Sequence, residues 1–190
     1  MGVSLNIMKR ELEAMGNVSI SSDGSLDFEN ARLYLGESSI AGDDILYVCS
    51  TSEDCESVRG YGRHAAFVDH HATKPDQTAV LSVTGGEGTL QVLNALLEIF
   101  YRFGMWERDM DAVLGRGGGL QELMDVSEKM LRNNVVVVDP ALKLLAYTKG
   151  TPCDDPITME LIGHGYHTEE NIRKFQLHLS LIHISEPTRH

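Results

Sequence analysis

Apolar residues recur at helical spacing from Leu120 to Leu131, with charged and amide side chains between them, which predicts an amphipathic helix. The run from Val135 to Val138 is β-branched and too short for a helix, so it predicts a strand. Asp139 and Pro140 supply the chemistry of a tight turn, and the stretch from Leu142 to Thr148 predicts the returning strand. The pattern therefore predicts a helix followed by a β-hairpin.

Residues 1–88 alternate short apolar runs with turn clusters, which predicts a small N-terminal α/β domain. A helix is expected from Leu5 to Met15, because its apolar residues share one face and Gly16 is placed to end it. Five strands are expected after this helix, at Val18 to Ile20, Ala31 to Leu35, Ile45 to Cys49, Ala65 to Asp69 and Thr78 to Val83. The pattern leaves the order of these strands open.

Residues 89–118 predict a helical connector between two folded units. Leu93, Leu96, Phe100 and Phe103 approach the spacing of a heptad seam. Two interpretations stay open: a helix packed on its own domain, or a dimer stalk that carries a signal between sensor units. In the second interpretation these four residues are the candidates for the dimer and signalling helix. The run of glycines in residues 115–119 ends the helix before the hairpin unit begins.

Composition restricts the function classes. Hydrophobic residues make up 42% of the 190 residues and charged residues 23%, which is typical of a globular protein. The net charge of -12 disfavours binding to a phosphate backbone. The chain has no apolar run of the roughly 20 residues that a membrane span requires. Three scattered cysteines do not make a disulfide framework, so we expect a cytoplasmic protein that does not contact membranes.

The last residues differ in character from the rest of the chain. The segment from Leu179 to Arg189 reads LSLIHISEPTR and matches, letter for letter, the translation of a sequencing-library adapter. We therefore interpret residues 179–190 as an artefactual tail and expect the natural sequence to depart from this one near His178.

The chain resembles the N-terminal part of a PucR-like transcriptional regulator, a group related to purine-catabolism and sugar-diacid regulators. The resemblance follows the chain in order. It rests on the segments Ile45 to Val48, Ser52 to Asp54, Phe100-Tyr101, Trp106-Glu107, Leu120 to Asp125, Asn134 to Asp139, Leu144 to Tyr147, Asp154 to Pro156 and Gly165-Tyr166.

The resemblance implies an α/β (α+β) architecture in which residues 119–178 are a truncated sensor domain of the GAF or PAS type. It implies a one-component regulator that is a homodimer and responds to an unknown small-molecule effector. Such regulators bind DNA through a C-terminal helix-turn-helix domain, which these 190 residues lack, so DNA binding is expected only through that missing domain.

One motif suggests an alternative. Asp69, His70 and His71 follow a predicted strand and match the short DHH signature of metal-dependent phosphoesterases, which hold two metal ions to activate water. The closely spaced upstream aspartates and histidine that this chemistry also needs are missing. We therefore expect no enzyme, no catalytic residue, no cofactor and no metal site. A DHH-like phosphoesterase and a ligand-free dimerisation module stay open as alternatives.

Overall fold

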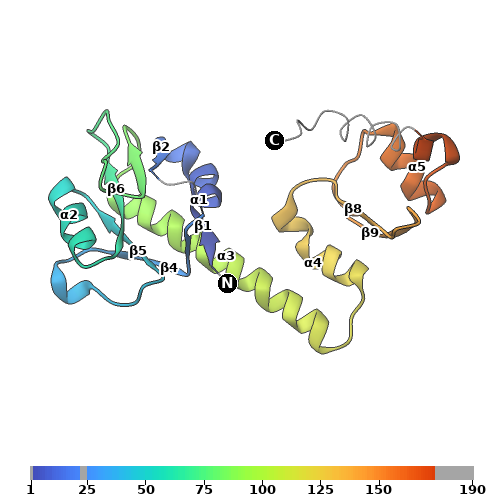
Figure 1. Cartoon of the computed structure of the whole chain (residues 1–190), viewed down its shortest axis with the longest axis horizontal. Coiled ribbons are helices and arrows are strands. Elements are labelled where there is room, and N and C mark those ends of the chain that lie inside the picture. Colours follow the sequence, from blue (N-terminus) through green and yellow to red (C-terminus); the bar gives the residue numbers. More distant parts are fainter. Residues whose placement is uncertain (1, 22–24, 174–190) are drawn as a thin grey trace, which may run out of the picture. The chain divides into compact units, whose positions relative to one another are not determined.

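The computed structural model of the protein describes residues 2–21 and 25–173. The chain divides into two compact units, residues 1–107 and 108–190, which are described separately (Figure 1). The predicted artefactual tail lies outside the described residues. Within the described part, no helix is long and apolar enough to cross a membrane.

The first unit is built on a five-stranded mixed sheet, which confirms the predicted α/β fold class. The order of the strands is β2-β7-β6-β5-β4. Strands β4, β5, β6 and β7 run parallel to one another, and β2 pairs with β7 in the antiparallel direction. The bounds are β2 (Asn17–Ile20), β4 (Asn30–Leu33), β5 (Ile45–Cys49), β6 (His64–Asp69) and β7 (Leu81–Thr84). A separate antiparallel pair joins β1 (Val3–Ser4) to β3 (Asp27–Phe28).

Helices accompany both faces of this sheet. The helical elements are α1 (Leu5–Leu12), η1 (Glu13–Met15), η2 (Glu37–Ser39), α2 (Ser52–Gly60) and α3 (Thr89–Gly115). Helix α2 was not predicted from the apolar pattern, because only Cys55 and Val58 of its nine residues are buried. The side chain of Thr51 caps the start of α2 by accepting a hydrogen bond from the backbone N–H of Asp54.

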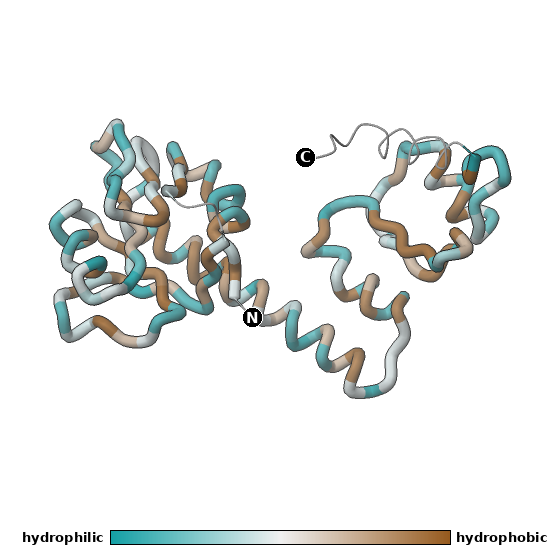
Figure 2. The backbone as a smooth tube through the Cα atoms, viewed as in Figure 1, coloured by the Kyte–Doolittle hydropathy of each residue, from teal (hydrophilic) through white to brown (hydrophobic). Residues whose placement is uncertain are grey.

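The core of the first unit has two layers, one on each face of the sheet. Cys55 and Val58 of α2 pack in one buried cluster with alternate residues of the central strands: Tyr47, Cys49, Ala65 and Phe67. The intervening residues point to the opposite face and are also buried: Leu46, Val48, Ala66 and Val68. Helices α1 and α3 supply the remaining buried apolar faces of this unit (Figure 1), and Figure 2 shows the hydrophobic residues along the strands.

Helix α3 is one continuous helix of 27 residues, and the boundary between the two units falls inside it. Val92, Leu96 and Ile99 are buried against the first unit. Leu97 and Tyr101, on the other side of the helix, are exposed. The predicted connector therefore begins as an integral part of the first unit.

The second unit contains the predicted helix and hairpin. Helix α4 spans Leu120–Leu131, and β8 (Val136–Val138) pairs with β9 (Leu144–Tyr147) in the antiparallel direction. Helix α5 (Pro156–His164) follows. The carboxylate of Asp139 organises the hairpin turn, because its Oδ1 accepts hydrogen bonds from the backbone N–H groups of Ala141 and Lys143, each at 2.9 Å.

Candidate functional site

A pocket of about 370 Å³ lies in the first unit, at the amino ends of β6 and β7. Its polar lining residues are Ser21, Arg59, Arg63, His64, Gln77 and Thr78, and Gly62 and Val80 complete the wall. The topology explains how residues so distant in sequence meet. His64 begins β6, Val80 precedes β7, and Ser21 follows β2, whose antiparallel pairing brings its carboxyl end to the same edge of the sheet. We call this cavity the amino-end pocket.

The end of α2 places the two arginines of the pocket. The helix ends at Gly60, and Gly62 adopts a φ of 67°, a left-handed conformation that favours glycine. The backbone N–H groups of Tyr61 and Arg63 then donate to the carbonyl of Val58. This tight turn leads the chain from α2 directly into β6, so that Arg59 and Arg63 line the same cavity.

Arg63 is held in place by an ion pair at the rim of the pocket. Its Nη2 lies 2.7 Å from Oδ1 of Asp43. The side chain of Arg63 is 29% exposed and that of Asp43 is 77% exposed, so solvent screens the pair. The Nε of Arg63 is buried and has no hydrogen-bond partner among the described residues. Next to Arg63, the ring of His64 meets Phe28 edge to face, with 5.6 Å between ring centroids.

The part of the wall that the loop before β7 contributes is fixed by hydrogen bonds. Oγ of Ser21 donates to the carbonyl of Ala79 at 2.7 Å. Oδ1 of Asp76 accepts from the backbone N–H groups of Thr78 at 2.7 Å and Ala79 at 3.2 Å, and also from the Thr78 hydroxyl. Burial raises the pKa of the Asp76 carboxyl, but hydrogen bonds from the Ser52 and Thr78 hydroxyls and from backbone N–H groups outweigh it and hold that pKa below its usual value.

The DHH residues lie at the other end of β6 from the amino-end pocket. Oδ1 of Asp69 accepts a hydrogen bond from the backbone N–H of His71 at 2.8 Å, which makes a local turn. The exposed rings of His70 and His71 lie against each other with centroids 3.8 Å apart. Across the described ranges 2–21 and 25–173, no group of three or more histidine, cysteine, aspartate or glutamate side chains is placed to hold a metal ion.

The two cysteines of the first unit are core residues. Cys49 and Cys55 are free and buried. A hydrogen bond with Cys49, followed by burial, raises the pKa of the Cys55 thiol. A thiol that stays protonated is a poor nucleophile and a poor metal ligand, so Cys55 is suited to packing in the buried cluster that also contains Cys49.

The structure divides the four candidate seam residues of α3 into two classes. Leu96 and Phe103 are buried within the single chain, whereas Leu93 and Phe100 are half-buried. Phe103 also meets Trp106, with ring centroids 6.0 Å apart. Leu93 and Phe100 are therefore the two candidates whose side chains keep surface for a second helix.

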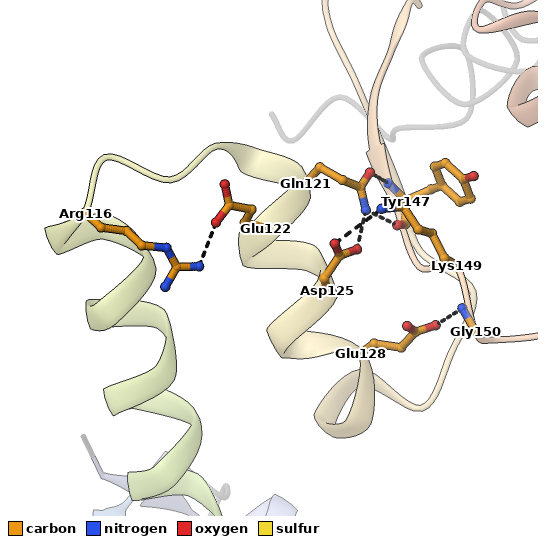
Figure 3. A network of polar contacts seen from close by, with 8 residues as sticks. All are labelled: Arg116, Gln121, Glu122, Asp125, Glu128, Tyr147, Lys149 and Gly150. Atoms are coloured by element: carbon orange, nitrogen blue, oxygen red, sulfur yellow. Dashed lines mark hydrogen bonds and ion pairs between the residues drawn. The ribbon is translucent and has the colours of Figure 1, made fainter.

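Polar contacts join α4 to the hairpin in the second unit (Figure 3). The Gln121 amide pairs with the backbone of Tyr147, accepting from N–H at 3.1 Å and donating to C=O at 2.8 Å. Asp125 forms an ion pair with Lys149 at 3.3 Å, and Glu128 accepts from the N–H of Gly150 at 2.5 Å. Since these three α4 residues follow each other at spacings of four and three, one face of the helix runs along β9.

A second pocket, of about 440 Å³, lies in the second unit between the end of β9 and α5. Its lining includes Tyr147 and Lys149, together with Met159 and Ile162 of α5. Cys153 also contributes to the wall. The mixture of apolar and polar side chains is that of a general small-molecule cavity.

Comparisons of the chain with protein-family models, with curated proteins and with solved structures found no match. The functional interpretation therefore depends on the residues themselves. Sequence reasoning missed the amino-end pocket. The signal that could have indicated it is the pair Arg59 and Arg63, separated by a glycine-rich turn and followed by a histidine.

Proposed function

We propose that this chain is the regulatory and sensor portion of a one-component transcription regulator of the PucR-like group. The observation that carries the proposal is α3, a single helix of 27 residues that begins in the core of the first unit and ends in the second. A helix shared in this way is suited to pass a change in one unit to the next. In the full-length regulator, a C-terminal helix-turn-helix domain would contact DNA.

The proposed mechanism is a shift between two arrangements of the regulator. An effector changes the balance only if it binds one arrangement better than the other. The amino-end pocket offers a binding site in the first unit, and α3 is anchored to that unit through Val92 and Leu96. A change of packing around the pocket would then alter how α3 is held.

The second unit would be the opening part of a GAF-like or PAS-like sensor domain. Helix α4 followed by the β8–β9 hairpin supports this, as does the pocket of mixed apolar and polar lining beside α5. The complete regulator would be a cytoplasmic homodimer, with Leu93 and Phe100 of α3 contributing to its seam.

A ligand screen tests the proposal. The purified chain is screened by thermal shift against purines, ureides and sugar acids, and hydrogen exchange is then measured with any ligand that raises the melting temperature. We expect at least one ligand to bind and to change exchange along residues 89–115. A ligand that binds and leaves exchange in this helix unchanged would contradict the mechanism.

The other outcomes of the screen are also informative. An empty screen, together with a dimer in light scattering, would favour the ligand-free dimerisation module. Manganese-dependent hydrolysis of a phosphodiester that is lost in Asp69→Ala would favour the phosphoesterase. As a final step, the full-length regulator should change its affinity for operator DNA when the same ligand is added.

A further inference from the structure

We infer that the amino-end pocket binds a small organic molecule through an oxyanion group, a carboxylate or a phosphate, held by Arg59 and Arg63. As a statement about the effector, this inference rests on the proposed function, because it names the chemical class that the regulator would sense. As a statement about binding, it stands on the pocket alone.

The first argument is the chemistry of the lining. The exposed Arg59 and the half-buried Arg63 line one cavity of about 370 Å³, together with His64 and Gln77. A guanidinium group presents its N–H donors in a planar fork that matches the two oxygens of a carboxylate or phosphate. The volume lies at the lower end of the range for small-molecule sites. The pocket therefore fits a compact anion better than a large apolar ligand.

The second argument is unused donor capacity. Arg63 uses Nη2 for its ion pair with Asp43, while its buried Nε has no hydrogen-bond partner among the described residues. In the part of the chain that the structure describes, no carboxylate forms an ion pair with Arg59. The hydroxyls of Ser21 and Thr78, by contrast, already donate to protein oxygens, so neither hydroxyl is a free donor for a ligand.

The third argument separates a binding role from a purely structural one. A basic residue in the last turn of a helix stabilises the helix dipole, which accounts for Arg59 on α2. This explanation does not extend to Arg63, which lies beyond the helix and faces the same cavity. The protein as a whole has a net charge of -12. In this pocket, by contrast, two arginines lie together, and the carboxylate paired with Arg63 is that of the exposed Asp43.

The test measures binding of simple probes to the purified 190-residue chain by isothermal titration calorimetry. The probes are tartrate, inorganic phosphate and threitol, which has the four-carbon skeleton of tartrate without the carboxylates. We expect tartrate or phosphate to bind and threitol not to bind. Arg59→Gln and Arg63→Gln should each weaken oxyanion binding at least tenfold. Lys74→Gln, which removes one exposed positive charge outside the pocket, is the matched control and should leave the affinity unchanged.

Asp43→Asn provides a test of opposite sign. This change removes the carboxylate that competes for Arg63, so it should strengthen oxyanion binding severalfold. Unfolding of the variant could not explain such a gain in affinity. Failure of both tartrate and phosphate to bind at millimolar concentration would overturn the inference, as would binding that Lys74→Gln weakens as much as Arg59→Gln. Preference for one probe would assign the carboxylate or the phosphate class.

The outcomes distinguish this inference from the proposed function. Binding that depends on Arg59 and Arg63 but leaves hydrogen exchange along α3 unchanged would support the pocket and contradict the regulatory mechanism. A ligand that changes α3 exchange but binds equally well to Arg59→Gln and Arg63→Gln would support the regulator and overturn the oxyanion site.

Discussion

Gln121 and Tyr147 are joined by a pair of hydrogen bonds in which a side-chain amide takes the place of a neighbouring strand. The amide accepts from the backbone N–H of Tyr147 and donates to its carbonyl, at 3.1 and 2.8 Å. Among the described residues, the sheet of the second unit consists of the two strands β8 and β9, and a hairpin alone is marginally stable in water. The contact with α4 therefore supplies hydrogen bonds that β9 would otherwise obtain from another strand.

The first prediction tests this pairing. Gln121→Ala removes both hydrogen bonds and should destabilise the hairpin by about 1–3 kcal/mol, since each bond contributes roughly 0.5–1.5 kcal/mol. Hydrogen exchange at the Tyr147 amide should accelerate by about tenfold. Lys129→Arg, on an exposed position of the same helix, is the control and should leave exchange at Tyr147 unchanged. Equal exchange in Gln121→Ala and the wild type would show that the pairing does not support β9.

The second prediction concerns the loop between β7 and α3. A Cβ atom built on Gly86 would lie 1.8 Å from the carbonyl oxygen of Met15 and 2.5 Å from the Cα atom of Gly16, both backbone atoms. Gly86→Ala should therefore lower the free energy of unfolding by about 1–3 kcal/mol or more, as overpacking does. Gly88→Ala is the matched control, because its Cβ would meet only the flexible Gln91 side chain, at 3.0 Å. Urea unfolding should separate the two variants.

The third prediction is a pH dependence. Because the pKa of Asp76 is lower in the folded protein than in the unfolded chain, its carboxylate stabilises the fold above the ordinary pKa of 3.8. This stabilisation should be lost as the pH falls from about 4 through the lower folded pKa. Asp76→Asn should therefore be less stable than the wild type at neutral pH, and the difference should shrink in acid. A difference in urea midpoint that stays constant from pH 7 to pH 3 would contradict the assignment.

The fourth prediction concerns self-association through α3. If Leu93 and Phe100 form a homodimer seam, replacing both with Glu places charges in an apolar interface and should halve the mass measured by light scattering. Gln91→Glu with Asn94→Glu adds two charges at exposed positions of the same helix and should leave the mass unchanged. Circular dichroism should remain that of the wild type in both proteins. An unchanged mass after the first replacement would remove the seam.

The spacing of apolar residues was sufficient to predict the elements whose buried face follows that spacing. The strand Ile45–Cys49 was predicted with its observed bounds, and α4 and the hairpin were predicted in order. The predicted strand from Thr78 to Val83 begins later, at Leu81, because the Asp76 side chain binds the backbone N–H groups of Thr78 and Ala79 before the strand starts. The spacing of apolar residues does not reveal where a polar side chain binds backbone N–H groups, so it could not predict this later start.

Other features depend on partners that are distant in sequence. Val3 pairs with Phe28 across two-residue strands, which are too short to show any period. The amino-end pocket needs the strand order, because Ser21 joins Arg59 and Thr78 only through the pairing of β2 with β7. The composition of the pocket could be read from the sequence only after that pairing was known.

The antiparallel strand β2 has a further consequence for handling this protein. It covers the outer side of β7, whose four residues are all buried. A shortened version that starts after Ile20 would leave β7 with a row of bare backbone N–H and C=O groups, which invites pairing with other molecules. The uncovered edge of β7 would then limit the solubility of the shortened protein, so a truncated version should retain β2.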